Sequence, residues 1–137
     1  MSAYTSEPHP LVFYVRNTPV RIDLLWAEVK QLGTVFPHRS GTPKLFNLDG
    51  SPASLIGLAL HDQGVCLADV AGVDNYNYRY IRDLIHDGRV PGRESLVDTD
   101  YADYLAQVES NEDHGMPWGR AVAGGQFVEQ IRKGVDG

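Results

Sequence analysis

The chain has 137 residues, a length that suits one domain with a single hydrophobic core, and we expect residues 1–137 to form it. With 42% hydrophobic and 22% charged residues and a net charge of −6, the composition excludes a disordered chain and disfavours nonspecific binding to nucleic acid or anionic membrane. No apolar run approaches the roughly 18 residues of a membrane span. Cys66 is the only cysteine, so an intramolecular disulfide is excluded and a cytoplasmic protein is expected.

Residues 1–10 are polar and are expected to form a loose arm. Residues 11–15 are β-branched and aromatic, which fits a strand or a buried helical turn equally well. Thr18 and Pro19 then give the cap-then-proline signal of a helix start, and Gly33 is expected to end that helix. Its apolar residues recur at helical spacing. They are Ile22, Leu25, Trp26, Val29 and Leu32.

The next segment is predicted to lead into a buried helix. Residues 44–48 are expected to be a short extended piece and, if residues 11–15 form a strand, its partner. A helix is predicted from Pro52 to about Gln63, and because it is apolar on nearly every side it should be central. Gly57 inside this helix predicts the close approach of another helix, since glycine is otherwise unfavourable there.

Residues 52–93 are predicted to form the central helical block of the domain. Two more helices are expected within it, a short one over residues 67–71 and a longer one over residues 76–87. The inward face of the longer helix consists of Ile81, Leu84 and Ile85.

A further helix is expected after Asp98 or Thr99, with inward residues of which several are aromatic or branched. Its last turn carries Glu109, Glu112 and Asp113. Negative charge is unfavourable at the carboxyl end of a helix, so these carboxylates are expected to have a partner elsewhere. The expected inward residues are Tyr101, Tyr104, Leu105 and Val108.

The last helix is predicted to begin at Pro117 and Trp118, and Gly124 with Gly125 should bend or split it. Together these elements predict a mostly α, compact single-domain bundle of five to six helices with at most a minor β-hairpin. We expect one shared core. It should contain Trp26, Leu55, Ile56, Leu60, Ile81, Leu84, Leu105 and Val122.

One face of the helix predicted over residues 76–87 carries the candidate binding residues. Arg79, Arg82 and His86 lie at i, i+3 and i+7, which places them together, away from the inward face. Arginine contacts phosphates and guanine edges, whereas tyrosine and arginine also anchor protein contacts. Asp83 and Asp87 on the same helix leave a solvated face of mixed charge as the alternative. The candidate binding set is Tyr76, Arg79, Tyr80, Arg82, His86, Arg89 and Arg93.

Residues 66–93 also fit part of a helix–turn–helix pattern, with Gly72 as the turn glycine. In this register the small and apolar positions are Ala68, Val73, Tyr78 and Ile81. In a second register, residues 80–91 resemble the recognition helix and following turn of excisionase-type DNA-binding proteins. That resemblance implies DNA binding through this helix.

A second resemblance covers residues 50–60, 64–65 and 113–122. These blocks are similar to small uncharacterised proteins of actinobacteria and their phages. The resemblance implies an intracellular, helix-rich fold and supplies no catalytic residues. That family often has a cysteine at the position where this chain has Ser54. Because serine has no thiol, the resemblance implies no thiol role at this position.

Enzyme signals are few. Cys66 lies between apolar residues and is expected to be a buried structural residue, and His61–Asp62 and Asp113–His114 are neighbours in sequence that point to different sides of a helix. No metal or cofactor motif is present, so neither is predicted. We therefore expect a non-enzymatic regulatory or interaction protein of phage type, with a protein partner slightly favoured over DNA and no membrane partner. The alternatives are a helix–turn–helix DNA-binding protein and a small enzyme using Cys66 or a histidine–carboxylate pair, and a homo-oligomer stays open.

Overall fold

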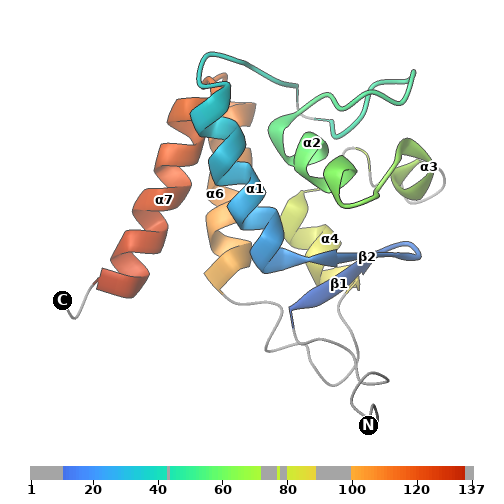
Figure 1. Ribbon diagram of the computed structural model, residues 1–137, viewed down its shortest axis with the longest axis horizontal. Coiled ribbons are helices and arrows are strands. Elements are labelled where there is room, and N and C mark those ends of the chain that lie inside the picture. The colour runs from blue at the N-terminus through green and yellow to red at the C-terminus, as the bar shows by residue number, and fades with distance from the viewer. Residues whose placement is uncertain (1–10, 43, 72–76, 78–79, 89–99, 135–137) are drawn as a thin grey trace, which may run out of the picture.

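The computed structural model describes residues 11–42, 44–71, 77, 80–88 and 100–134, so the arm expected at residues 1–10 lies outside the described residues. These residues form six helices and one small antiparallel hairpin, which confirms the mostly α fold (Figure 1). The elements are β1 (Val12–Val15), β2 (Thr18–Arg21), α1 (Ile22–Val35), α2 (Leu55–Asp62), α3 (Leu67–Val70), α4 (Ile81–Gly88), α6 (Asp100–Asp113) and α7 (Trp118–Gly134).

The hairpin pairs β1 with β2 and corrects two predictions. The partner of β1 is β2, not residues 44–48, and Thr18 and Pro19 lie in that strand instead of capping a helix. Phe13 of β1 and its cross-strand partner Val20 of β2 are both buried. Strand pairing at Thr18–Arg21 therefore places two apolar side chains against each other, a contact that a helix beginning at Thr18 would lack. The tight turn places Arg16 at a φ of 58°.

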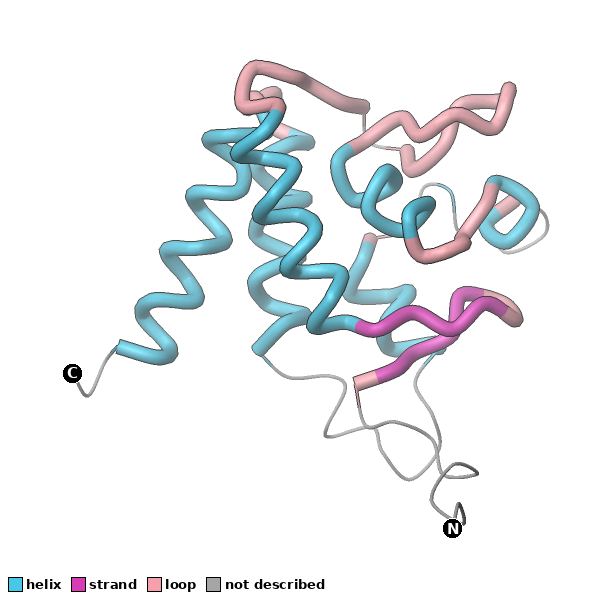
Figure 2. Tube along the Cα trace, in the orientation of Figure 1, coloured by secondary structure: helices cyan, strands magenta, loops and turns pink. Residues whose placement is uncertain are grey.

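The three longest helices, α1, α6 and α7, pack side by side (Figures 1 and 2). Trp26 of α1 is buried, with its ring 5.4 Å from the ring of Tyr104 of α6. Gly125 of α7 faces this pair, where a side chain would collide with Trp26 and Val108. Of the expected bend or split at Gly124 and Gly125, the split is wrong, because α7 is one continuous helix from Trp118 to Gly134. The missing side chain at Gly125 lets this helix approach α1 and α6 closely.

Gly33 does not end α1 as predicted, because the helix continues to Val35. A side chain at Gly33 would collide with Val122 of α7. The glycine therefore serves the contact between two helices and not a left-handed turn.

Helix α2 is buried on nearly every side, as predicted, but begins later than Pro52. Pro52 lies in an isolated antiparallel bridge with Phe46, which holds it in extended backbone. Ser54 caps the helix instead, and its hydroxyl oxygen accepts the N–H of Gly57 at 3.0 Å. Gly57 faces the backbone carbonyl of Leu45, so the close neighbour is a loop and not the predicted helix.

Helix α4 packs against α6 and β1. Ile81, Leu84 and Ile85 are buried, as the second sequence register predicts. Gly88 ends the helix as expected, and it lies against the backbone of Tyr14 in β1, where there is no room for a side chain.

The predicted core residues belong to one buried cluster to which the hairpin and the helices contribute. Trp26, Leu55, Ile56, Leu60, Ile81, Leu84, Leu105 and Val122 are all members, which confirms the shared core. Within the described ranges, no helix has both the length and the apolar character needed to cross a membrane.

Replacing Leu55 with alanine should lower the free energy of unfolding by about 2–5 kcal/mol, because Leu55 is fully buried and the change leaves a cavity. The matched control is Leu24→Ala, since Leu24 of α1 is 50% exposed and should change that free energy by only about 0.5 kcal/mol or less. Urea unfolding of both variants measures the difference. Equal effects at the two positions would contradict this core.

A carboxyl pair joins α1 to α2. A hydrogen bond with Asp62 raises the pKa of Glu28 to about 7, and partial burial and the charge of Asp62 add to the shift. Up to about pH 7 the folded state therefore holds a proton on Glu28 that the unfolded chain releases near pH 4.5. The contribution of this proton to the free energy of unfolding is lost as the pH rises from 4.5 through about 7.

Glu28→Gln should therefore raise the melting temperature at about pH 8, where it removes the repulsion from Asp62, and change it little at about pH 5. Thermal unfolding at the two pH values measures this, with the acid value as the internal control. A shift of the same size at both would show that the two carboxyls do not interact.

Candidate functional site

Three of the predicted binding residues lie in the described part of the chain: Tyr80, Arg82 and His86. Tyr80 precedes α4 and is 63% exposed, while Arg82 and His86 lie one turn apart on the exposed face of that helix. The other four predicted residues lie outside the described residues. They are Tyr76, Arg79, Arg89 and Arg93.

The charge of Arg82 is engaged with a carboxylate. Its guanidinium binds Asp103 of α6 at 2.6 Å, and Arg132 of α7 binds the other oxygen of Asp103 and also Asp100, the latter at 2.6 Å. Partial burial raises the pKa of Asp103, but the hydrogen bonds and charges of the two arginines outweigh it and hold that pKa below its ordinary value. Three helices thus meet at Asp103, and α4 presents a charge-balanced face instead of a free cationic one.

Beside this ion pair lies a groove between α4 and α6, with a volume of about 320 Å³. We call it the α4–α6 groove, and it is lined by Tyr80, Arg82, Asp83, Ala106, Glu109 and Ser110. Two of these residues were predicted from the sequence as binding residues, and both are exposed. The groove therefore brings Tyr80 and Arg82 together with a carboxyl from a different helix.

Glu109 is the buried member of the groove, with only 8% of its surface exposed. Both of its carboxyl oxygens accept the backbone N–H of Ile81, each at 3.0 Å. Burial raises its pKa to about 8, and the nearby acids Asp113, Glu112 and Asp83 add to the shift, while the Ile81 N–H opposes it. At neutral pH, Glu109 is therefore mostly protonated.

Glu112 makes a similar contact with α2. Its Oε2 accepts the backbone N–H of Leu55 at 3.1 Å and the indole N–H of Trp118 at 2.8 Å, and burial raises its pKa. The prediction that the acidic end of this helix has partners elsewhere is confirmed for Glu109 and Glu112. Their partners are the first N–H groups of α4 and α2.

Cys66 is exposed, so its prediction as a buried residue is wrong. The left-handed turn at Gly64, with a φ of 100°, is followed by fully buried Val65, and the next side chain points outward. The Cys66 backbone N–H donates to the Asp69 carboxylate at 3.0 Å, and its thiol lies 3.5 Å from the same oxygen. The thiol therefore contacts an acid, and among the described residues no hydrogen bond joins it to a histidine, the group that activates a thiol nucleophile.

The histidine–carboxylate pairs are engaged in other contacts. The His61 ring packs against Phe46 with 6.2 Å between the ring centroids, and His114 Nδ1 lies 2.7 Å from the carbonyl oxygen of Ser110. No group of three or more histidine, cysteine or acidic side chains that could hold a metal ion is found in the part of the chain that the structure describes.

Of the segment that the helix–turn–helix hypothesis concerns, the structure describes residues 66–71, 77 and 80–88. Ala68 lies in α3, which is a single turn of four residues, and α4 begins at Ile81. Gly72, Val73 and Tyr78 lie outside the described residues, so the turn between the helices stays a prediction.

No family model, curated protein or solved structure matches this chain. The resemblances to actinobacterial and phage proteins and to excisionase-type segments therefore stay predictions.

Glu109 offers a test of the groove. Glu109→Gln keeps an acceptor for the Ile81 N–H and removes the titrating group, whereas Glu109→Leu leaves that N–H unpaired, which should cost about 1–3 kcal/mol of the free energy of unfolding. Because the pKa of Glu109 is raised from 4.5 to about 8, its contribution to stability is present at acid pH and is lost between those values as the pH rises.

The wild type should therefore lose more stability than Glu109→Gln between about pH 5 and about pH 9. Urea unfolding across this range measures the two curves. If they run parallel, Glu109 is not held protonated by its burial.

Proposed function

We propose that this chain is a regulatory or interaction module that binds another protein through the α4–α6 groove, and that it is not an enzyme. The observation that supports the proposal is the groove itself, where exposed Tyr80 and Arg82 stand beside buried Glu109. Tyrosine and arginine are the residue types that, with tryptophan, most often anchor protein contacts next to a pocket.

The lining of the groove indicates what a partner would bring. Ala106 and the ring of Tyr80 offer apolar surface for one side chain of the partner. Ser110 and the mostly protonated carboxyl of Glu109 offer hydrogen bonds to backbone groups. A short uncharged segment with one apolar anchor fits these properties best.

DNA binding by the same surface is the alternative. It is favoured by the exposure of Arg82, but Arg82 already binds Asp103, which Arg132 also binds. A phosphate would have to displace that carboxylate, and the chain as a whole carries a net charge of −6. The balance of these charges supports a protein partner over DNA.

A random peptide library panned against the protein tests the proposal. Peptides that bind the groove should bind Tyr80→Ala at least about tenfold more weakly, a loss of about 1.4 kcal/mol. Phe127→Ala is the matched control, because Phe127 of α7 is an aromatic residue with the same 63% exposure outside the groove, and binding should persist. If no selected peptide distinguishes the two variants, the groove is not the binding surface.

Fluorescence anisotropy with a labelled DNA duplex at low salt tests the alternative. The proposal expects nothing tighter than nonspecific binding, for which dissociation constants of about 10⁻⁴ to 10⁻⁶ M are typical at physiological salt. Tighter binding that weakens with added salt and with Arg82→Ala would replace the protein partner by DNA.

A further inference from the structure

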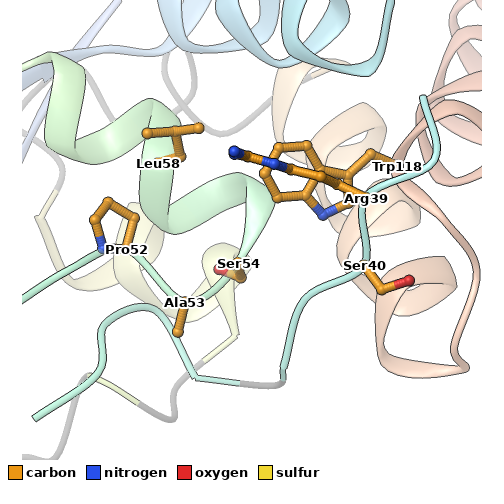
Figure 3. Close-up of a pocket in the computed structure, with 7 residues that line it drawn as sticks. All are labelled: Arg39, Ser40, Pro52, Ala53, Ser54, Leu58 and Trp118. Atoms are coloured by element: carbon orange, nitrogen blue, oxygen red, sulfur yellow. The ribbon is translucent and has the colours of Figure 1, made fainter. Parts of the chain in front are cut away.

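A second hollow shares none of its described lining residues with the α4–α6 groove. It has a volume of about 340 Å³ and lies between the segment after α1, the segment before α2 and the start of α7. Figure 3 shows Arg39 extending across it, with its side chain over the indole of Trp118 and its guanidinium toward Leu58. We call it the Arg39 pocket, lined mainly by Arg39, Pro52, Ser54, Leu58 and Trp118.

Aromatic rings hold Arg39 in place. Its guanidinium carbon lies 4.4 Å from the ring centroid of Phe36 and 5.4 Å from that of Trp118. Among the described residues it has no carboxylate partner, and this sets it apart from three other arginines. Arg21, Arg82 and Arg132 each bind at least one carboxylate. The pocket is therefore lined by an oriented cation that no described carboxylate neutralises.

The wall beneath Arg39 is fixed from two sides. The Trp118 indole N–H donates to buried Glu112 at 2.8 Å, and the Trp118 backbone N–H donates to the carbonyl of Arg39 at 2.8 Å. Oε2 of Glu112 accepts both this indole N–H and the backbone N–H of Leu55. Glu112 is not among the described residues that line the pocket. The aromatic platform is thus set before any ligand arrives.

Ser54 supplies a second polar group to the pocket. It is only 5% exposed, and its oxygen accepts the N–H of Gly57. A hydroxyl also has a proton to donate, and that proton has no acceptor among the described residues. Because Ser54 and Glu112 already satisfy N–H groups at the start of α2, a ligand in this pocket would be selected by Arg39 and the Ser54 hydroxyl, not by the helix end.

We propose that the Arg39 pocket binds a small carboxylic acid with an apolar body. The planar guanidinium matches the two oxygens of a carboxylate, and the Ser54 hydroxyl can donate to the same group. Pro52, Leu58 and the Trp118 ring offer apolar surface for the rest of the ligand. The volume lies at the lower end of the roughly 300–1,000 Å³ of small-molecule sites, which restricts the ligand to a small one.

A carboxylate suits the pocket better than a phosphate. Of the described residues that line the pocket, Arg39 alone is charged, and a phosphate carries close to two charges at neutral pH. A single guanidinium balances one negative charge in a paired hydrogen-bonding geometry. The ligand is therefore a monoanion, and its neutral amide should not replace it.

Titration with a panel of acids, followed by NMR on the full chain, tests this proposal. The panel consists of acetate, butyrate, phenylacetate and indole-3-propionate, each paired with its amide. At least one acid with an apolar body should shift the indole N–H signal of Trp118 in a saturable way, while its amide should not. If none of the acids binds in a saturable way, the proposal is overturned. It is also overturned if an acid and its amide shift the signal equally.

Two substitutions locate the site. Arg39→Gln should weaken binding of the acid at least about tenfold, whereas Arg120→Gln, at an exposed arginine of α7 outside the pocket, should leave it unchanged. Leu58→Trp is a second variant that fills the pocket and leaves Arg39 intact, and it should also abolish binding. Wild-type affinity in Arg39→Gln, or in a folded Leu58→Trp, contradicts the assignment.

Discussion

The structure depends on one interaction that α6 makes twice: a buried carboxyl group accepts the first backbone N–H of another helix. Glu109 accepts the N–H of Ile81 at 3.0 Å, and Glu112 accepts that of Leu55 at 3.1 Å. The first N–H groups of a helix have no acceptor within it, and leaving a buried one unpaired costs about 1–3 kcal/mol. Because the two acids lie three residues apart on one face of α6, they fix α4 and α2 together.

The same two side chains support both surfaces for which we propose ligands. Glu109 lines the α4–α6 groove and holds the start of α4, which carries Arg82 and follows Tyr80. Glu112 holds the indole of Trp118, over which Arg39 lies. Burial raises the pKa of both acids, which reflects the cost of burying a charged carboxylate. Each of these buried acids lies where it positions one of the two proposed binding surfaces.

The sequence predicted the elements whose apolar residues repeat at helical spacing, such as the helix around Trp26, because burial follows that period. The predicted helix start at Thr18 was wrong, because a cap-then-proline signal is local and the pairing of β2 with β1 outweighed it. Gly33 was predicted to end the helix because a left-handed turn and close packing between helices both select glycine, and the sequence does not distinguish them. The charge sign at Glu109 did reveal a distant partner. The Arg39 pocket has no sequence signal, because segments far apart in the chain build it.

Amide hydrogen exchange at Ile81 and Leu55 tests the central claim most directly, because a first-turn amide is ordinarily open to solvent. If the carboxyls of α6 hold α4 and α2, both amides should exchange as slowly as those of the buried core and only through global unfolding. Exchange at the rate of an unprotected amide, in protein whose core amides stay protected, would show that Glu109 and Glu112 do not hold these helices.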